Sequence, residues 1–205
     1  MSNRSIHTLL KSWDEECPLT REEAVEVLNL PEEEMDSLME CAYALRTKYK
    51  GKKVSVQLLT NVRSGNCTQN CAYCAQSKDS QAEIEKYKRV SDEKLYGDND
   101  LVDEKHLARH CIGLSGIGFS DEEIEDLADR IREMKKKDTQ ICCSIGFLTE
   151  KQARILKDAG LDRINHNLNS SRSFYPEICT THTYDQRVNN IKMLQSLGFE
   201  ICSGG

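Results

Sequence analysis

The sequence predicts an α/β fold in which strands and helices alternate to form part of a parallel (β/α) barrel. From residue 51 onward, short apolar segments rich in β-branched residues alternate with amphipathic segments of helical period. This alternation is typical of repeated βα units, which build parallel sheets and barrels. Residues 1–50 lack such strands and are expected to form an N-terminal helical extension. Residues 51–205 are expected to form the first five βα units of an incomplete barrel.

The extension is predicted to contain two helices. Thr20 and Glu23 have the spacing of a capping box, in which each side chain satisfies a backbone N–H of the first turn. Pro31 can occupy the first turn of a second helix, because that turn needs no backbone donor. Gly51 is expected to end this second helix.

Five strands and the helices between them are predicted in the rest of the chain. Capping boxes indicate where three of the helices begin: Ser120 with Glu123, Thr149 with Gln152, and Thr183 with Gln186. Gly160 and Gly198 are expected near the ends of the second and third of these helices. The strands are expected at residues 54–59, 108–114, 140–145, 163–168 and 199–203.

The segment from Lys94 to Lys105 is predicted to be an irregular helix. It contains Gly97-Asp98-Asn99-Asp100, and all of these residue types have low helix propensity. Five strands are fewer than the eight of a complete barrel. The last predicted strand also ends the sequence without a covering helix, so the chain is expected to be the front part of a longer barrel.

Composition excludes several classes of function. The formal net charge of −6 argues against a nucleic-acid partner, which would require a basic face. The sequence has no apolar stretch long enough to span a membrane and no apolar signal segment after Met1, so a cytoplasmic location is expected. Ten cysteines in such a protein indicate metal or cluster binding rather than disulfides.

Three cysteines, Cys67, Cys71 and Cys74, follow the first predicted strand on one short loop. Three thiolates are one fewer than the four ligands that a 4Fe–4S cluster takes from cysteine, so one iron would remain open for a small molecule. A structural zinc ion is the rival interpretation. Zinc sites usually pair two short cysteine clips, and no second clip is present in the sequence, which favours the cluster.

A second group, Cys111, Cys142 and Cys202, is spaced at intervals of about one and two βα units. Asn165 and Asn167 lie on the strand between the last two cysteines. Alternation of side chains along each strand places the three cysteines on the inner face of the barrel, where they could hold a second cluster. Buried core cysteines are an equally good interpretation of the spacing alone.

The remaining candidates are interpreted as structural. The side chain of His166, between Asn165 and Asn167, is expected to point outward from the barrel and to serve in packing or hydrogen bonding. Four other cysteines are taken as buried or incidental thiols: Cys17, Cys41, Cys143 and Cys179.

Four motifs in order resemble those of the biotin synthases, a family of radical S-adenosylmethionine (SAM) enzymes. The resemblance extends from about Ala42 to Gly205. The motifs are Cys67-Thr-Gln-Asn-Cys71-Ala-Tyr-Cys74-Ala-Gln-Ser77, Asn165-His-Asn167-Leu-Asn169-Ser, Thr180-Thr-His-Thr-Tyr-x-x-Arg187 and Cys202-Ser-Gly-Gly205.

The resemblance implies roles for the residues of these motifs. Cys67, Cys71 and Cys74 would hold a 4Fe–4S cluster whose open iron binds SAM. Tyr73 would lie near the adenine, and Arg187 would pair with the SAM carboxylate. Asn167 would contact SAM and substrate as a catalytic residue, and Asn169 would bind the ribose hydroxyls.

The resemblance also implies that Cys111, Cys142 and Cys202 hold an auxiliary 2Fe–2S cluster, with a four-iron centre left open as an alternative. The activity would be that of a sulfurtransferase, which inserts sulfur from this cluster into dethiobiotin to give biotin. An external one-electron reductant of the flavodoxin or ferredoxin type is implied, and so is a homodimer.

Two departures from the family pattern leave alternatives open. Ile164 stands where the family often has Tyr, and Asn169 replaces an acidic residue. The auxiliary cluster also lacks a fourth ligand within the sequence, so the chain could be inactive by itself. The alternatives are a related radical SAM enzyme, of the hydrogenase-cofactor maturase or methylornithine synthase type, or a non-catalytic iron–sulfur or zinc-binding fragment.

Overall fold

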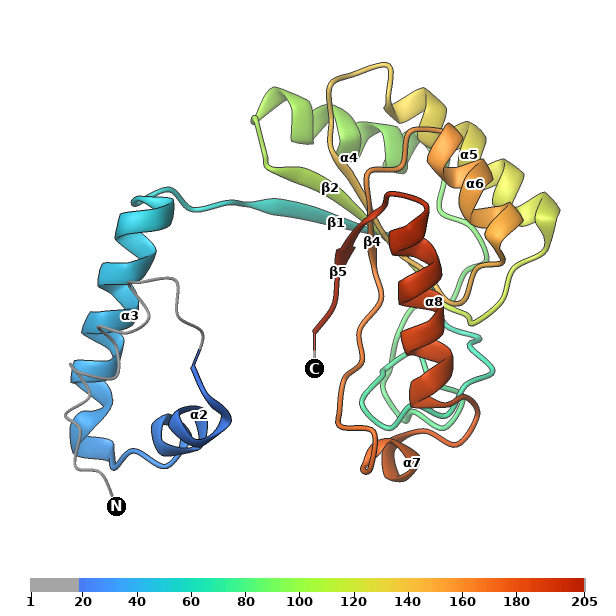
Figure 1. Ribbon diagram of the computed structural model, residues 1–205. Coiled ribbons are helices and arrows are strands. Elements are labelled where there is room, and N and C mark those ends of the chain that lie inside the picture. Colours follow the sequence, from blue (N-terminus) through green and yellow to red (C-terminus); the bar gives the residue numbers. More distant parts are fainter. Residues whose placement is uncertain (1–18, 205) are drawn as a thin grey trace. The chain divides into compact units, whose positions relative to one another are not determined.

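A computed structural model describes residues 19–204 (Figure 1). The chain divides into two compact units, Met1–Val54 and Ser55–Gly205. Cys17 lies outside the described residues. Among the residues described, no helix combines the length and the apolar character needed to cross a membrane.

The described part of the first unit is helical. Helix α2 (Arg21–Leu28) begins at Thr20 with the predicted capping box. A 3-10 turn, η1 (Glu32–Glu34), follows Pro31 and leads into α3 (Met35–Lys50). Gly51 ends α3 with φ +62°, a left-handed conformation that favours glycine. Neither α2 nor α3 contains a buried residue.

The described part of the second unit contains a five-stranded sheet in the order β1-β2-β3-β4-β5, and every pair of neighbouring strands is parallel. All five predicted strands are confirmed. The first is displaced toward the C-terminus, and β4 is shorter than expected. The strands are β1 (Gln57–Arg63), β2 (Arg109–Leu114), β3 (Ile141–Ser144), β4 (Arg163–Asn165) and β5 (Glu200–Cys202).

The helices of this unit are α4 (Asp92–Glu104), α5 (Asp121–Met134), α6 (Glu150–Asp158), α7 (Tyr175–Ile178) and α8 (Tyr184–Ser196). The capping boxes predicted for α5, α6 and α8 are all present. In Figure 1 the long helices α4, α5, α6 and α8 lie along one face of the sheet. The hydrophobic core fills this side, with Ile112, Cys143 and Ile164 of the sheet packed against residues such as Ile124 and Leu156 of the helices.

Helix α4 corrects one prediction, because it is regular through Gly97-Asp98-Asn99-Asp100. Asp98 accepts hydrogen bonds from Thr60 Oγ1 (2.6 Å) and Lys94 Nζ (2.6 Å). Asn99 donates to the carbonyl of Met134 (3.2 Å). These tertiary partners stabilise the two polar side chains in the helix and outweigh their low helix propensity.

Candidate active site

The opposite face of the sheet carries the polar residues that the sequence places inside the barrel. Strand register sets Cys111 beside Cys142, and Asn165 beside Cys202. Ile112, Cys143 and Ile164 alternate with them and point into the core, as the period of two requires. Cys111, Cys142 and Cys202 therefore share the inner face on three strands, β2, β3 and β5.

Arginine lies close to this group of thiols. Burial and the nearby Cys111 raise the pKa of Cys142 to about 12, and the positive charge of Arg163 opposes this rise. Arg163 pairs with Cys142 in the strand register and bonds Glu200 (2.6 Å) at the sheet's edge. A cation beside buried thiols stabilises their charged form, which is the form that binds metals.

The cysteine loop follows directly after β1 and is held in place at both of its ends. The amide oxygen of Gln76 accepts the backbone N–H of Gly65, and Ser115 Oγ donates to the Gly65 carbonyl (2.6 Å). Gly65 has φ +69°, and a Cβ there would lie 2.5 Å from the side chain of Lys86. Gln76, just after the third cysteine, therefore ties the end of the loop to Gly65 at its start.

The middle of the loop is fixed by the segment that follows α7. Asn70 Oδ1 accepts hydrogen bonds from the backbone N–H groups of Thr180 (3.1 Å) and Thr181 (3.3 Å). The N–H of Ala72 donates to the carbonyl of Ile178 (2.9 Å). Two of the four motifs, far apart in the sequence, thus form one local structure.

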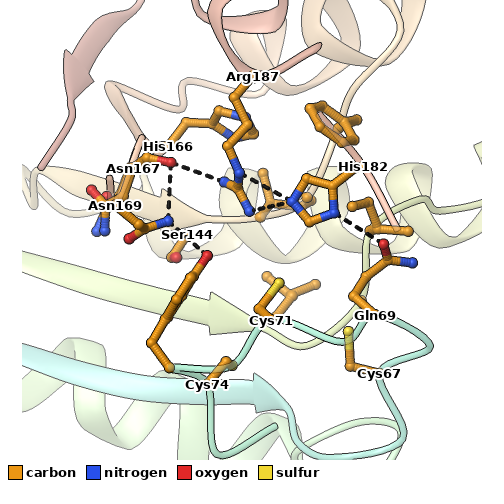
Figure 2. A pocket seen from close by; sticks show the side chains of 18 residues that line it. Cys67, Gln69, Cys71, Cys74, Ser144, His166, Asn167, Asn169, His182 and Arg187 are labelled. Carbon is orange, nitrogen blue, oxygen red and sulfur yellow. Dashed lines mark hydrogen bonds between the residues drawn. The ribbon is translucent and has the colours of Figure 1, made fainter. Parts of the chain in front are cut away.

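A cavity of about 190 Å³ brings the predicted residues of the first group together. In Figure 2 the cysteine loop lies along one side of this cavity, and His182 and Arg187 lie across from it. All seven residues predicted to bind the first cluster and SAM line the cavity: Cys67, Cys71, Tyr73, Cys74, Asn167, Asn169 and Arg187.

Polar contacts preorganise the side of the cavity that faces the cysteines. Asn169, at φ +66°, donates from Nδ2 to the hydroxyl of Tyr73 (2.7 Å). Asn167 Oδ1 accepts the backbone N–H of Gly204 (2.8 Å). Arg187 donates to the Asn167 carbonyl (3.0 Å) and to the hydroxyl of Tyr175 (2.6 Å). One guanidinium therefore connects α8, α7 and the segment after β4.

Sequence reasoning missed several residues of this site. Cys179, predicted to be a buried or incidental thiol, is buried, but its Sγ also lies 3.8 Å from Cys71 Sγ. His182 contacts Cys179, Gln69 and Arg187. Cys179 and His182 lie three residues apart, and both a thiolate and an imidazole can bind a metal ion. This Cys-x-x-His spacing was the signal available in the sequence.

The thiols of this region ionise unequally. Burial, followed by the charge of Cys179, raises the pKa of Cys71 to about 11. Burial also acts on Cys179, but hydrogen bonds from Thr181 and the neighbouring backbone outweigh it and lower its pKa. Of the two neighbours, Cys179 is therefore the readier to become a thiolate.

His166 is buried and packs against the ring of Phe147, with ring centroids 5.4 Å apart. It also lines the cavity, which the expected outward orientation did not anticipate. Neither ring nitrogen has a hydrogen-bond partner among the described residues. Burial, and then the nearby Arg187, lower its pKa to about 4, so the ring is neutral at pH 7.

Comparisons with known proteins agree with these motifs. Curated biotin synthases of Geobacillus kaustophilus (strain HTA426) and Bacillus subtilis (strain 168) are each 40% identical to the chain over 187 residues, which is 91% of this chain. The match covers 56% of each relative, so the chain spans just over half the length of these proteins.

Two solved structures show the same fold at low sequence identity. A methylornithine synthase superposes with a TM-score of 0.84 at 17% identity, covering 96% of this chain and 58% of that one. A maturase of the [FeFe]-hydrogenase superposes with a TM-score of 0.81 at 17% identity, covering 100% of this chain and 46% of that one. The partial parallel barrel predicted from the sequence is therefore the arrangement observed.

The family model described as "Radical SAM superfamily" matches residues 61–205, which include the cysteine loop and the C-terminal ends of all five strands. The chain belongs to the radical SAM superfamily.

Proposed function

We propose that this chain forms the SAM-binding part of a biotin synthase, a sulfurtransferase that converts dethiobiotin into biotin. The observation that carries the proposal is the second group of cysteines on the inner face of β2, β3 and β5. A radical SAM enzyme needs only the loop cysteines to cleave SAM, so a second thiol group beside the cavity calls for a further function. The 40% identity to biotin synthases supports sulfur insertion as that function.

The residues of the first site fit a 4Fe–4S cluster with SAM. Three thiols on one loop line a cavity together with a guanidinium, four side-chain amides and a phenol. Soft thiolates are the preferred ligands of iron–sulfur clusters, and three of them leave one iron open. When bound, the cluster supplies the electron that cleaves SAM to methionine and a 5′-deoxyadenosyl radical.

The chain's own residues would bind and orient SAM. Arg187 would turn its guanidinium from its present partners toward the carboxylate of SAM, because a planar fork of donors suits a carboxylate. The side-chain amide of Asn169 would exchange hydrogen bonds with the ribose hydroxyls, as both acceptor and donor. Tyr73, which Asn169 already contacts, would lie beside the adenine. Ile117, Ile145 and Phe147 line the cavity and would exclude water from it.

The inner-face thiols of Cys111, Cys142 and Cys202 fit an auxiliary cluster, since they lie on three strands of one face with Arg163 beside them. A 2Fe–2S cluster there would supply the sulfur atom that enters the product. Asn167 lies next to β5 through its bond to Gly204 and lines the first cavity as well. It would therefore position the substrate between the two groups of cysteines.

The partners follow from this chemistry. Dethiobiotin is the proposed substrate, and an external one-electron reductant of the flavodoxin or ferredoxin type would supply the electrons. We also predict a homodimer and a cytoplasmic location.

Anaerobic reconstitution tests whether the two sites are separate. The Cys67→Ala variant is expected to lose the iron, sulfide and absorption of the four-iron cluster and to keep those of the auxiliary cluster. The Cys111→Ala/Cys142→Ala variant is expected to do the reverse. Loss of both clusters in either variant, or zinc in place of iron, would contradict the assignment.

Activity is tested in the longest polypeptide that contains this sequence. Incubation with dethiobiotin, SAM and a reductant should yield biotin and 5′-deoxyadenosine. Production of 5′-deoxyadenosine without a sulfur-containing product would point instead to a radical SAM enzyme of another specificity.

A further inference from the structure

Three buried side chains at the edge of the cavity are not all accounted for by the proposed function. Cys71, Cys179 and His182 are 8%, 3% and 6% exposed, and one ligand atom from each lies within 4.8 Å of the others. Only Cys71 belongs to the cysteine loop. We propose that Cys71, Cys179 and His182 form a site for a single Zn²⁺ ion when the four-iron cluster is absent.

Two of the three distances between the ligand atoms are close to those of a mononuclear tetrahedral site, and the third lies within 4.8 Å. With Zn–S bonds of about 2.3 Å, two thiolates on one tetrahedral zinc ion lie about 3.8 Å apart. The Sγ atoms of Cys71 and Cys179 are 3.8 Å apart. A thiolate and an imidazole nitrogen on the same ion lie about 3.6 Å apart, since Zn–N bonds are about 2.0–2.1 Å. His182 Nε2 lies 3.7 Å from Cys179 Sγ, and Nδ1 lies 3.3 Å from it.

The hydrogen bonds of His182 leave Nε2 as the metal-binding nitrogen. Arg187 can only donate, and it donates to Nε2 at 3.2 Å and 2.9 Å, so this nitrogen presents a lone pair. Nδ1 lies 3.0 Å from Oε1 of Gln69 and therefore carries the proton. A carbonyl oxygen that orients the second nitrogen of a ligating histidine is typical of zinc sites.

The charge and the access of the site also suit a divalent ion. Two thiolates neutralise Zn²⁺, so the occupied site adds no net charge to a buried region. Two sulfurs and one nitrogen leave a fourth position for water, as in Cys₂His sites. Cys71 and His182 both line the cavity, which provides the path of entry.

Zinc occupancy would exclude the proposed function of the region. A bound zinc ion would use the Cys71 thiolate, which the four-iron cluster needs. It would also use the lone pair of His182 Nε2, which now accepts a hydrogen bond from Arg187. The site and the four-iron cluster therefore compete for one thiolate. The zinc site itself does not depend on biotin synthesis, and only this competition rests on the proposed function.

Cobalt titration tests the site directly, because Co²⁺ reports tetrahedral thiolate ligation by its absorption and binds more weakly than Zn²⁺. The chain is used metal-free under anaerobic conditions, with serine replacing the other candidate thiolates, which are Cys67, Cys74, Cys111, Cys142 and Cys202. We expect one Co²⁺ per chain, with thiolate charge-transfer bands and intense ligand-field bands, displaced by one equivalent of Zn²⁺.

Adding Cys179→Ser or His182→Ala to this background should weaken Co²⁺ binding by more than about 100-fold, which exceeds the loss typical of a non-ligating neighbour. Gln69→Ala should weaken it by about 10–100-fold, as removal of an orienting partner does. Cys41→Ser is the matched control and should leave the titration unchanged. Circular dichroism confirms that each variant is folded, and tetrahedral Co²⁺ binding that survives Cys179→Ser in folded protein would overturn the site.

A second experiment compares the unaltered chain with the Cys179→Ser variant. Preincubation with one equivalent of Zn²⁺ should suppress assembly of the four-iron cluster, and Cys179→Ser should relieve the suppression while still assembling the cluster without zinc. Equal suppression in both proteins would overturn the proposal. Failure of the zinc-free chain to assemble a cluster would count against the proposed function, whereas the cobalt result would stand independently.

Discussion

Arg187 is the residue on which SAM binding is expected to depend most among the polar groups of the cavity. Its guanidinium donates in several directions from one fork, and a lysine ammonium cannot reproduce this planar geometry. Hydrogen bonds to charged groups contribute about 1.5–3 kcal/mol, so Arg187→Lys should weaken SAM binding by about 10–100-fold. Isothermal titration of the reconstituted protein measures the effect.

The matched control for this prediction is Arg172→Lys. Arg172 pairs with Asp185 on the exposed surface, where an ion pair contributes little. It should leave the SAM affinity unchanged. Equal losses in both variants would show that Arg187 has no specific role.

His110 is expected to make the stability of the protein depend on pH. It is fully buried between Thr60 (2.9 Å) and Asn99 (3.2 Å), and burial lowers its pKa to about 4. The unfolded chain, with a histidine pKa near about 6.5, binds this proton first. Stability is therefore complete above the unfolded pKa and is lost as the pH falls from about 6.5 toward 4.

Urea unfolding at pH 7.5 and pH 5 should reveal this loss, of which His110 contributes about 2 kcal/mol. His166 and His182 have pKa values lowered in the same direction, so the difference between variants isolates one residue. His110→Asn should flatten the profile by that amount. His106→Asn, at an exposed position, should leave the pH dependence of stability unchanged. The same pH dependence in both variants would refute the assignment to His110.

At this scale the sequence predicted part of the cavity lining but not how those residues are arranged. The cysteines, Asn165 and Asn167 were found because metal ligands and strand parity follow simple rules of type and spacing. Tyr73, Asn169 and Arg187 were predicted only from the family resemblance. Cys179 was missed because its importance comes from the loop–loop contact made by Asn70, which no local pattern records. A tertiary hydrogen bond, not a helix or strand period, sets that distance.

Helix α4 offers the clearest prediction at the scale of an element. Gly97 is exposed within the helix, and a Cβ added there would meet no atom within 4 Å. Because alanine loses less backbone entropy than glycine, Gly97→Ala should raise the free energy of unfolding by about 0.5–1 kcal/mol. Chemical denaturation of the two proteins checks the sign and the size.

The opposite result is expected at Gly160, the control for this substitution. Gly160 has φ +97°, and an added Cβ would lie 3.1 Å from the side chain of Lys135. Gly160→Ala should therefore be destabilising, because the left-handed conformation strains any residue with a Cβ. If both alanines stabilised the protein, the distinction between the two conformations would be wrong.

The positions of the helices and strands were predicted better than the contacts between them, because the signals that set them are local. Capping boxes such as Ser120 with Glu123 act within four residues, so their hydrogen bonds can be inferred from the sequence. The regularity of α4 could not be inferred from the sequence, because a hydrogen-bond partner of Asp98 is Thr60 on a distant strand. Local rules thus fix where helices begin, and tertiary contacts decide which weak segments persist.

At the scale of the whole molecule, the two units are expected to differ in local stability. Helix α3 contains no buried residue, whereas six residues of α5 are buried. A helix of about 16 residues without tertiary burial is marginal in water. Its amides should therefore open through local fluctuations, and those of α5 only through unfolding of the sheet and its helices.

Hydrogen exchange followed by mass spectrometry measures this difference directly. Peptides from Met35–Lys50 should exchange at least about 100-fold faster than peptides from Asp121–Met134 at pH 7, which corresponds to about 2.7 kcal/mol of opening free energy. Gly51–Lys53, near the end of the first unit, should be an early site of limited proteolysis. Exchange at equal rates in both helices would contradict the proposed difference in local stability.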